Sequence, residues 1–209
     1  MILPLRAPLR ALRLAILLGT MLAVGLGGAV PARAAPLDYL ISQHYGTIGF
    51  SVSQLGLFTV DGRFMRFEGR LAINEQHPMQ TRIDVTIEAG SAAMASPDAV
   101  AMLRSPAYFD VARYPKIHFV SSSITETGTN QFVIHGILTI RGIAHPQSLD
   151  ATLVHEQDPP GAPTIADFRV TGSLERSLFG MTANENFVGN KVGLAIIIRL
   201  ALDAPAHGD

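Results

Sequence analysis

The sequence predicts an all-β protein, built as an antiparallel β-barrel of about eight strands. Three observations support this fold class. Apolar and polar residues alternate in short runs, which is the pattern of strands with one buried face. Residues that favour turns separate these runs. The connections are mostly short, and a meander of strands with one apolar face closes naturally into a barrel.

The predicted strands lie at 48–52, 60–74, 82–88, 115–123, 131–141, 147–156, 167–171 and 192–202. Alternation is cleanest at 82–88, where Ile83, Val85 and Ile87 interleave with polar and charged residues. Turn-forming sequences separate the strands, such as Asp158-Pro159-Pro160-Gly161. A barrel of this size either fills with its own side chains or holds one slender ligand, and the strand pattern leaves both possibilities open.

One segment between two predicted strands has the pattern of a short helix over 97–104. Ser96 is suited to the N-cap, Pro97 to the first helical position and Asp98 to the first turn. Pro106 stops the helix soon after Arg104. Because the segment separates two strands, we expect the helix to cross an open end of the barrel.

We expect three segments: a signal peptide over 1–34, one β-barrel domain over 35–203 and a C-terminal tail over 204–209. Three arginines precede an uncharged run from Leu14 to Val30, and Ala32-Arg33-Ala34 supplies a small-residue cleavage site. An uncleaved anchor helix is the alternative, because the run approaches the length that spans a bilayer. The glycines of the run favour cleavage after Ala34 and export to the periplasm.

Charge and cysteine content exclude several classes of partner and chemistry. Removal of 1–34 takes away four of 16 basic residues and none of 17 acidic ones, which leaves a net charge of −5. Nucleic acid and anionic membrane surfaces are therefore not expected partners. Cysteine is absent, so disulfides, thiol catalysis and Cys-ligated zinc are excluded.

Several motifs resemble the YceI-like family of exported barrels associated with polyisoprenoid binding. The resemblance extends over nearly all of 38–203. It is carried by His44 with Ile48-Gly49-Phe50-Ser51-Val52, by 103–111 with Tyr114-Pro115-Lys116-Ile117-His118-Phe119, by 136–142 with His145-Pro146, and by Leu174-Glu175-Arg176-Ser177-Leu178-Phe179-Gly180-Met181.

This resemblance implies a lipocalin-like barrel with an elongated apolar cavity suited to an isoprenoid chain, such as a polyprenyl lipid or a quinone tail. Two positions depart from the family pattern. Tyr45 replaces the small polar residue that usually follows the histidine, and Tyr108 replaces one aromatic of a Phe-Phe pair. Both substitutions bear on the shape of the cavity mouth and therefore on the identity of the ligand.

No motif in the chain specifies catalysis, a metal site or a cofactor. The six histidines of the expected domain, at 44, 77, 118, 135, 145 and 155, lack the spacing of a helical zinc motif. The Gly-x-Ser-x-Gly motif of serine hydrolases does not occur. Paired carboxylates can always be chosen from 17 acidic residues, so they carry little information. We therefore predict a protein that is not an enzyme.

The candidate ligand-binding residues are mostly the aromatic and aliphatic side chains expected to face the barrel interior. They are His44, Phe50, Val52, Phe64, Phe67, Phe109, Ile117, Phe119, Phe168, Val170, Arg176 and Phe179. Two of them bring polar atoms. His44 could hydrogen-bond a head group. Arg176 either pairs with an acid such as Asp110 or faces an anionic or carbonyl head group at the cavity mouth.

Three functions remain possible from the sequence. The leading hypothesis is non-catalytic binding, transport or sequestration of an isoprenoid lipid or quinone-like molecule. An enzyme acting on a lipid inside the barrel would need a buried polar cluster containing a group with a strongly shifted pKa. A filled barrel serving as a stress-response or interaction module would have no continuous cavity. The oligomeric state is left open.

Overall fold

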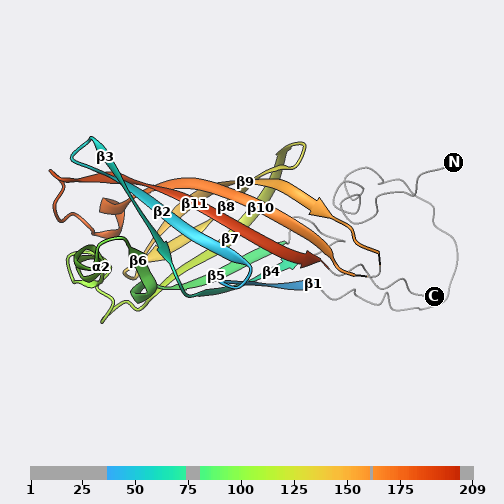
Figure 1. The fold of residues 1–209 in the computed structure, drawn as a ribbon, viewed down its shortest axis with the longest axis horizontal. Coiled ribbons are helices and arrows are strands. Elements are labelled where there is room, and N and C mark those ends of the chain that lie inside the picture. The colour runs from blue at the N-terminus through green and yellow to red at the C-terminus, as the bar shows by residue number, and fades with distance from the viewer. Residues whose placement is uncertain (1–36, 74–80, 161, 203–209) are drawn as a thin grey trace, which may run out of the picture.

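The computed structural model describes residues 37–73, 81–160 and 162–202 (Figure 1). The expected signal peptide, the expected tail at 204–209 and His77 lie outside these residues. The strands are β1 (Leu37–Ser42), β2 (Gly46–Gln54), β3 (Phe58–Phe64), β4 (Phe67–Ile73), β5 (Arg82–Glu88), β6 (Ala92–Met94), β7 (Lys116–Gly128), β8 (Gln131–Ile140), β9 (Ile143–Gln157), β10 (Thr164–Glu175) and β11 (Val188–Leu202). The helices are η2 (Ala89–Ser91), α2 (Pro97–Arg104) and η3 (Arg176–Phe179).

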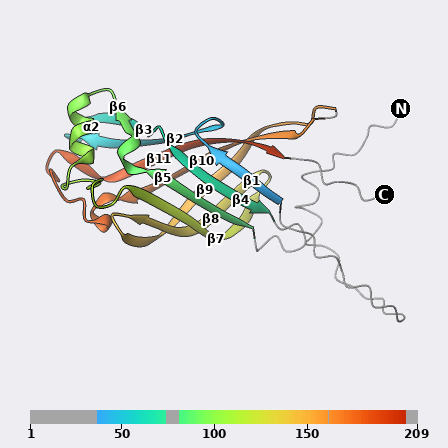
Figure 2. The same cartoon turned by 90° about the horizontal axis from the view of Figure 1, so that it is seen from below.

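The strands form one antiparallel sheet in the order β1-β4-β5-β7-β8-β9-β10-β11-β2-β3-β6. Figure 2 shows that this sheet curls around its long axis into a half-barrel. The all-β class and the single short α-helix are confirmed within the described residues. The hydrogen-bonded ladder has two edges, β1 and β6, so it does not close on itself as a complete barrel would.

The prediction of about eight strands is wrong, because the described part of the chain forms eleven. The expected strand at 60–74 divides at Met65 and Arg66 into β3 and β4, which pair with different neighbours. Backbone bonds of this linker, from Met65 N to Ser91 O and from Glu88 N to Arg66 O, hold the bend. β1 and the three-residue β6 were not predicted, since such short segments show little alternation.

Helix α2 forms where the sequence predicts it and lies at one end of the curled sheet (Figure 1). The Ser96 hydroxyl accepts a hydrogen bond from the backbone N–H of Ala99, and Pro97 opens the first turn. The following loop folds inward and buries Tyr108, Phe109 and Asp110. Within the described ranges, no helix is both long and apolar enough to cross a membrane.

The longest ladder joins β10 to β11, from Thr164 opposite Leu202 to Glu175 opposite Lys191. On its outer face Asp167 lies opposite Arg199, whose Nε and Nη2 donate to the carboxylate at 2.7 and 2.9 Å. These hydrogen bonds are the main reason why the pKa of Asp167 lies below its ordinary value of 3.8, although burial opposes the shift. The pair therefore stabilises the folded state only while Asp167 is ionised.

We expect Asp167→Asn to lower the free energy of unfolding at pH 7 by up to about 1 kcal/mol. A lowered pKa in the folded state means that this stabilisation is present above pH 3.8 and is lost as the pH falls below it. Urea unfolding of both proteins at several pH values measures the difference. A difference that persists unchanged well below the lowered pKa would contradict this account.

Candidate functional site

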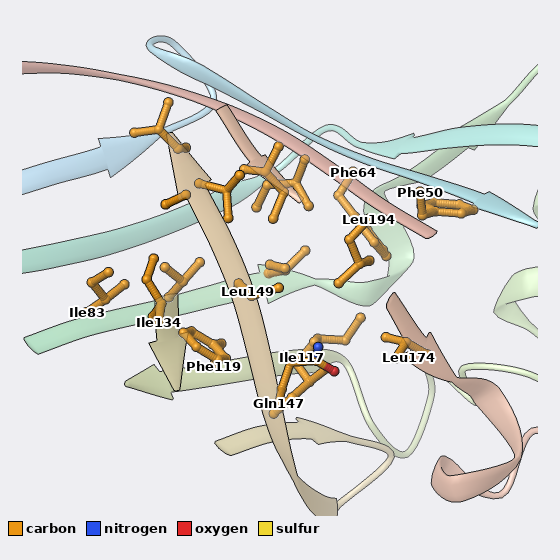
Figure 3. A pocket seen from close by; sticks show the side chains of 18 of the residues that line it. Phe50, Phe64, Ile83, Ile117, Phe119, Ile134, Gln147, Leu149, Leu174 and Leu194 are labelled. Atoms are coloured by element: carbon orange, nitrogen blue, oxygen red, sulfur yellow. The ribbon is translucent and has the colours of Figure 1, made fainter. Parts of the chain in front are cut away.

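A cavity of about 1000 Å³ runs along the inside of the curled sheet (Figure 3). Every strand except β6 contributes at least one side chain to its wall, and Leu103 of α2 lines it as well. The side chains that face the cavity are the apolar members of the alternating pattern, such as Ile83, Val85 and Ile87 on β5. A filled barrel would have no such space, so the interior holds a cavity and is not only a packed core.

The cavity is long. Ile117 and Glu126 both line it, and both lie on β7. At about 3.3 Å per residue, this stretch of strand extends roughly 30 Å. A space that extends over this length can hold an elongated molecule.

Most of the wall is aliphatic or aromatic, and its polar side chains are few. They are Thr81, Tyr108, Ser123, Thr125, Glu126, Gln147 and Arg176. Thr81 Oγ1 is buried without a hydrogen-bond partner among the described atoms. Gln147 uses its amide to bond the carbonyls of Ser148 and Ser173 at 2.8 and 3.1 Å. The wall therefore offers a ligand mainly apolar contact.

Nine of the twelve candidate residues line this cavity: Phe50, Val52, Phe64, Phe109, Ile117, Phe119, Phe168, Val170 and Arg176. The aromatic members pack against one another, with Phe64 between Phe50 at 5.3 Å and Phe109 at 5.8 Å between ring centroids. Phe132 and Phe168 form a second pair at 6.4 Å. The structure thus brings together residues that lie far apart in the sequence.

Three candidate residues do not line the cavity. His44 lies in the exposed β1–β2 turn, where its Nδ1 is 3.5 Å from the hydroxyl of Ser42. Phe67 is buried in the core at the start of β4, beside the bend from β3. Phe179 belongs to η3 and packs edge-on against His145, at 5.3 Å between ring centroids. These three side chains contribute to the turn and the core instead.

Sequence reasoning missed many aliphatic wall residues, because it selected aromatic side chains first. Ile83, Val85 and Ile87 already stood out for their alternation, yet they were not assigned to the site. Ile134, Leu138 and Ile140 share one face of β8 in the same way. Extending the period-two pattern along each strand would have found them. Tyr108 and Met181 lie in loops, where no period identifies them.

Arg176 is 3% exposed and holds the segment that leads into β11. Its Nε donates to Gly189 O at 3.0 Å, its Nη1 to Met181 O at 2.5 Å and its Nη2 to Val188 O at 2.9 Å. The register of β11 against β2 is irregular between Val188 and Val192, so the carbonyls of Val188 and Gly189 lie where the ladder is interrupted. Arg176 supplies the donors that the neighbouring strand does not.

The anticipated pairing of Arg176 with Asp110 is not observed. The carboxylate of Asp110 lies 3.8 Å from Arg113, and the guanidinium of Arg176 lies over the ring of Tyr108 at 5.9 Å. Asn184 in turn donates to the hydroxyl of Tyr108 at 3.1 Å. Arg176 and Tyr108 therefore connect the η3 segment to the loop after α2 at one end of the cavity.

The cavity wall has few charged side chains. Its charged side chains are Glu126, which is exposed, and Arg176, which is occupied by backbone carbonyls. The groups with a clearly shifted pKa, Asp167 and Arg199, do not line it. In the part of the chain that the structure describes, no three His, Asp or Glu side chains are grouped to hold a metal.

Gly136 on β8 positions a wall residue, because it leaves room for the ring of Phe119 on β7. A Cβ at this position would lie 2.5 Å from Val120 O and 2.6 Å from the Phe119 ring. We expect Gly136→Ala to lower the free energy of unfolding by about 1–3 kcal/mol, measured by urea unfolding. Gly90→Ala is the control, since nothing lies within 4 Å of a Cβ there. Equal effects of the two variants would contradict the close packing.

Comparisons with known proteins agree with this geometry. The YceI-like domain matches residues 39–204. A UPF0312 protein of Photorhabdus laumondii is 30% identical over 168 residues, which cover 80% of this chain and 87% of that protein. Protein YceI of Salmonella arizonae is 28% identical over 167 residues, covering 79% and 87%.

Solved structures share the fold. BcnA of Burkholderia cenocepacia has a TM-score of 0.67 at 20% identity, covering 76% of this chain and 98% of that one. A polyisoprenoid-binding domain of Saccharophagus degradans, implicated in plant cell wall breakdown, has a TM-score of 0.57 at 11% identity, covering 79% and 98%. With a domain match over most of its length and relatives that cover it equally well, the chain belongs to the YceI-like domain family.

Proposed function

We propose that this chain binds an isoprenoid lipid, either a polyprenyl chain or a quinone tail, and carries or sequesters it in the periplasm without changing it chemically. The observation that carries this proposal is the long apolar cavity of about 1000 Å³. Pockets for small molecules commonly span about 300–1,000 Å³, so this one is at the upper end of that range. It offers space for a chain of several isoprene units.

The driving force for binding is the removal of apolar surface from water. Each buried carbon contributes about 0.8 kcal/mol, so a five-carbon isoprene unit contributes about 4 kcal/mol before the costs of ordering the chain. A ligand held in this way needs few directed polar contacts, which agrees with the sparse polar lining. The polyisoprenoid-binding domain of Saccharophagus degradans, which shares the fold, supports the choice of ligand class.

We assign the wall of the site to Phe50, Val52, Phe64, Phe109, Ile117, Phe119, Phe168 and Val170, all of which line the cavity. Arg176 lines it as well, but three backbone carbonyls occupy its guanidinium. We therefore assign Arg176 to holding the end of the cavity. Tyr108, also in the lining, belongs to the same end and departs from the family pattern.

Native mass spectrometry of the protein purified from the periplasm of its own source tests this proposal. A bound species that extracts into organic solvent and shows an isoprene mass ladder is the expected result. Uptake of a fluorescent polyprenyl analogue is measured in parallel, with a straight acyl analogue of the same carbon number as control. A protein that is always empty and takes up neither probe would refute the proposal, and preference for the straight chain would refute the isoprenoid assignment.

A further inference from the structure

The β2–β3 turn and the segment just before β11 lie at the end of the molecule where α2 lies (Figure 1), and these two segments carry four exposed large apolar side chains. Leu55, Leu57 and Phe58, from the β2–β3 turn, are 53%, 82% and 62% exposed, and Phe187, just before β11, is 58% exposed. The backbone N–H of Leu55 donates to Phe187 O at 2.7 Å, so the two segments form one surface. We call these four residues the apolar tip.

The backbone conformation of the β2–β3 turn is one that leucine rarely adopts. Leu55 and Gly56 have φ of 53° and 68°, and Leu57 N donates to Gln54 O at 3.2 Å. A two-residue turn with positive φ at both positions favours Asn-Gly or Asp-Gly, which are also better solvated. The chain instead places a leucine in an unfavourable conformation and exposes it to solvent. Folding alone does not account for this residue, but contact with an apolar partner does.

The apolar tip carries no formal charge. Residues 53–59 and 186–190 contain no Asp, Glu, Lys or Arg, although the domain as a whole is expected to be acidic. A surface without charge gains nothing from an anionic partner and avoids the large cost of moving a charge into a hydrocarbon layer. The absence of charge on the tip is therefore compatible with a bilayer of uncharged or zwitterionic lipids.

The apolar tip adjoins the cavity. Val52 on β2 and Val188 at the start of β11 both line the cavity, and each lies close in sequence to residues of the tip. Val188 pairs with Gln54, the residue that precedes the turn. A membrane in contact with the tip would lie next to the end of the cavity that Val52 and Val188 line.

The size of the apolar tip argues against a second copy of the chain as its partner. Four side chains exposed to this extent present on the order of 500 Å². A stable protein interface needs about 800 Å² on each partner. A bilayer requires no complementary shape, so a few large side chains at one projecting point are enough for reversible insertion.

We infer that the apolar tip docks the protein onto a lipid bilayer with an uncharged or zwitterionic surface. The further step, that docking lets a lipid chain pass between membrane and cavity, rests on the proposed function. Docking of this kind is transient, because the inserted side chains belong to a turn and not to a membrane-spanning element.

Tryptophan fluorescence tests the docking directly, because the chain contains no Trp. Phe58→Trp places a reporter in the tip, and Ile137→Trp places one on the exposed outer face of β8. With vesicles of phosphatidylcholine and phosphatidylethanolamine and no added ligand, we expect a blue shift of the emission for Phe58→Trp only. No shift, equal shifts, or a shift that depends on protein concentration without vesicles would overturn the inference.

A second measurement separates docking from ligand binding. The double variant Leu57→Ser with Phe58→Ser leaves every cavity-lining residue unchanged. We expect it to extract a fluorescent polyprenyl lipid from these vesicles at least tenfold more slowly, while its affinity for a short, water-soluble isoprenoid probe stays the same. An unchanged extraction rate would overturn the inference. If the unmodified protein fails to bind the soluble probe, the proposed function is refuted. The blue shift of Phe58→Trp with vesicles would still support docking.

Discussion

Phe119→Glu is expected to abolish uptake of a polyprenyl analogue. Phe119 lies in the cavity wall on β7, and its side chain faces the interior (Figure 3). A carboxylate there would have to lose its water when an apolar chain enters, and no described cation stands next to it to compensate. We expect binding to weaken at least 100-fold, which corresponds to about 3 kcal/mol and lies within the penalty for burying a polar group without a partner.

Two further variants separate this effect from a loss of folding. Ala151→Phe fills the cavity from β9 without adding charge, so it should also reduce uptake while preserving the sheet. Ile137→Glu places the same carboxylate on the outer face of β8, where the side chain is exposed, and should leave uptake unchanged. Fluorescence titration measures binding, and circular dichroism checks folding. Normal uptake by folded Phe119→Glu and Ala151→Phe would contradict the assignment of the cavity.

Arg176→Met is expected to cause the largest loss of stability among the variants considered. The guanidinium donates to the carbonyls of Met181, Val188 and Gly189, and methionine can satisfy none of them. Each buried carbonyl left without a donor costs about 1–3 kcal/mol, although some will find water. We expect the free energy of unfolding to fall by about 3–5 kcal/mol, measured from the midpoint of urea unfolding at constant slope.

Arg113→Met is the matched control for this variant. Arg113 is largely exposed and lies 3.8 Å from the carboxylate of Asp110, so its removal should change stability by no more than about 1 kcal/mol. Arg176→Lys should be nearly as unstable as Arg176→Met. A single ammonium cannot reach three separated carbonyls that the planar guanidinium contacts at once. A loss below 1 kcal/mol for Arg176→Met would show that the segment before β11 is held by other contacts.

The sequence was sufficient to predict the class of fold because strand periodicity is a local property. The clean alternation at 82–88 predicted β5, and the capping residue Ser96 predicted the start of α2. Strand number and closure depend on long-range pairing, which local patterns do not contain. Nothing local shows that β1 pairs with β4 and not with β2, or that Met65 and Arg66 turn one run into two strands with different partners.

The site was predictable to the extent that its residues alternate along strands. Phe50 and Val52, or Phe168 and Val170, reach the cavity because period two sends them to the same side. His44 was chosen from the resemblance and Phe179 as an aromatic residue expected to face inward. Both lie in segments outside the strands, where neighbouring elements decide the direction of a side chain. The role of Arg176 could not be predicted either, since it depends on an interrupted ladder between β11 and β2.

The cavity occupies the place where a protein of this kind would normally have its core, and this couples occupancy to folding. A molecule that binds there binds the folded chain and not the unfolded one, so it adds about 2.7 kcal/mol of stability at a free concentration 100 times its Kd. Empty and occupied molecules then differ in melting temperature and in resistance to proteases. Thermal denaturation of the freshly isolated protein would therefore report how much of its ligand was available where it was made.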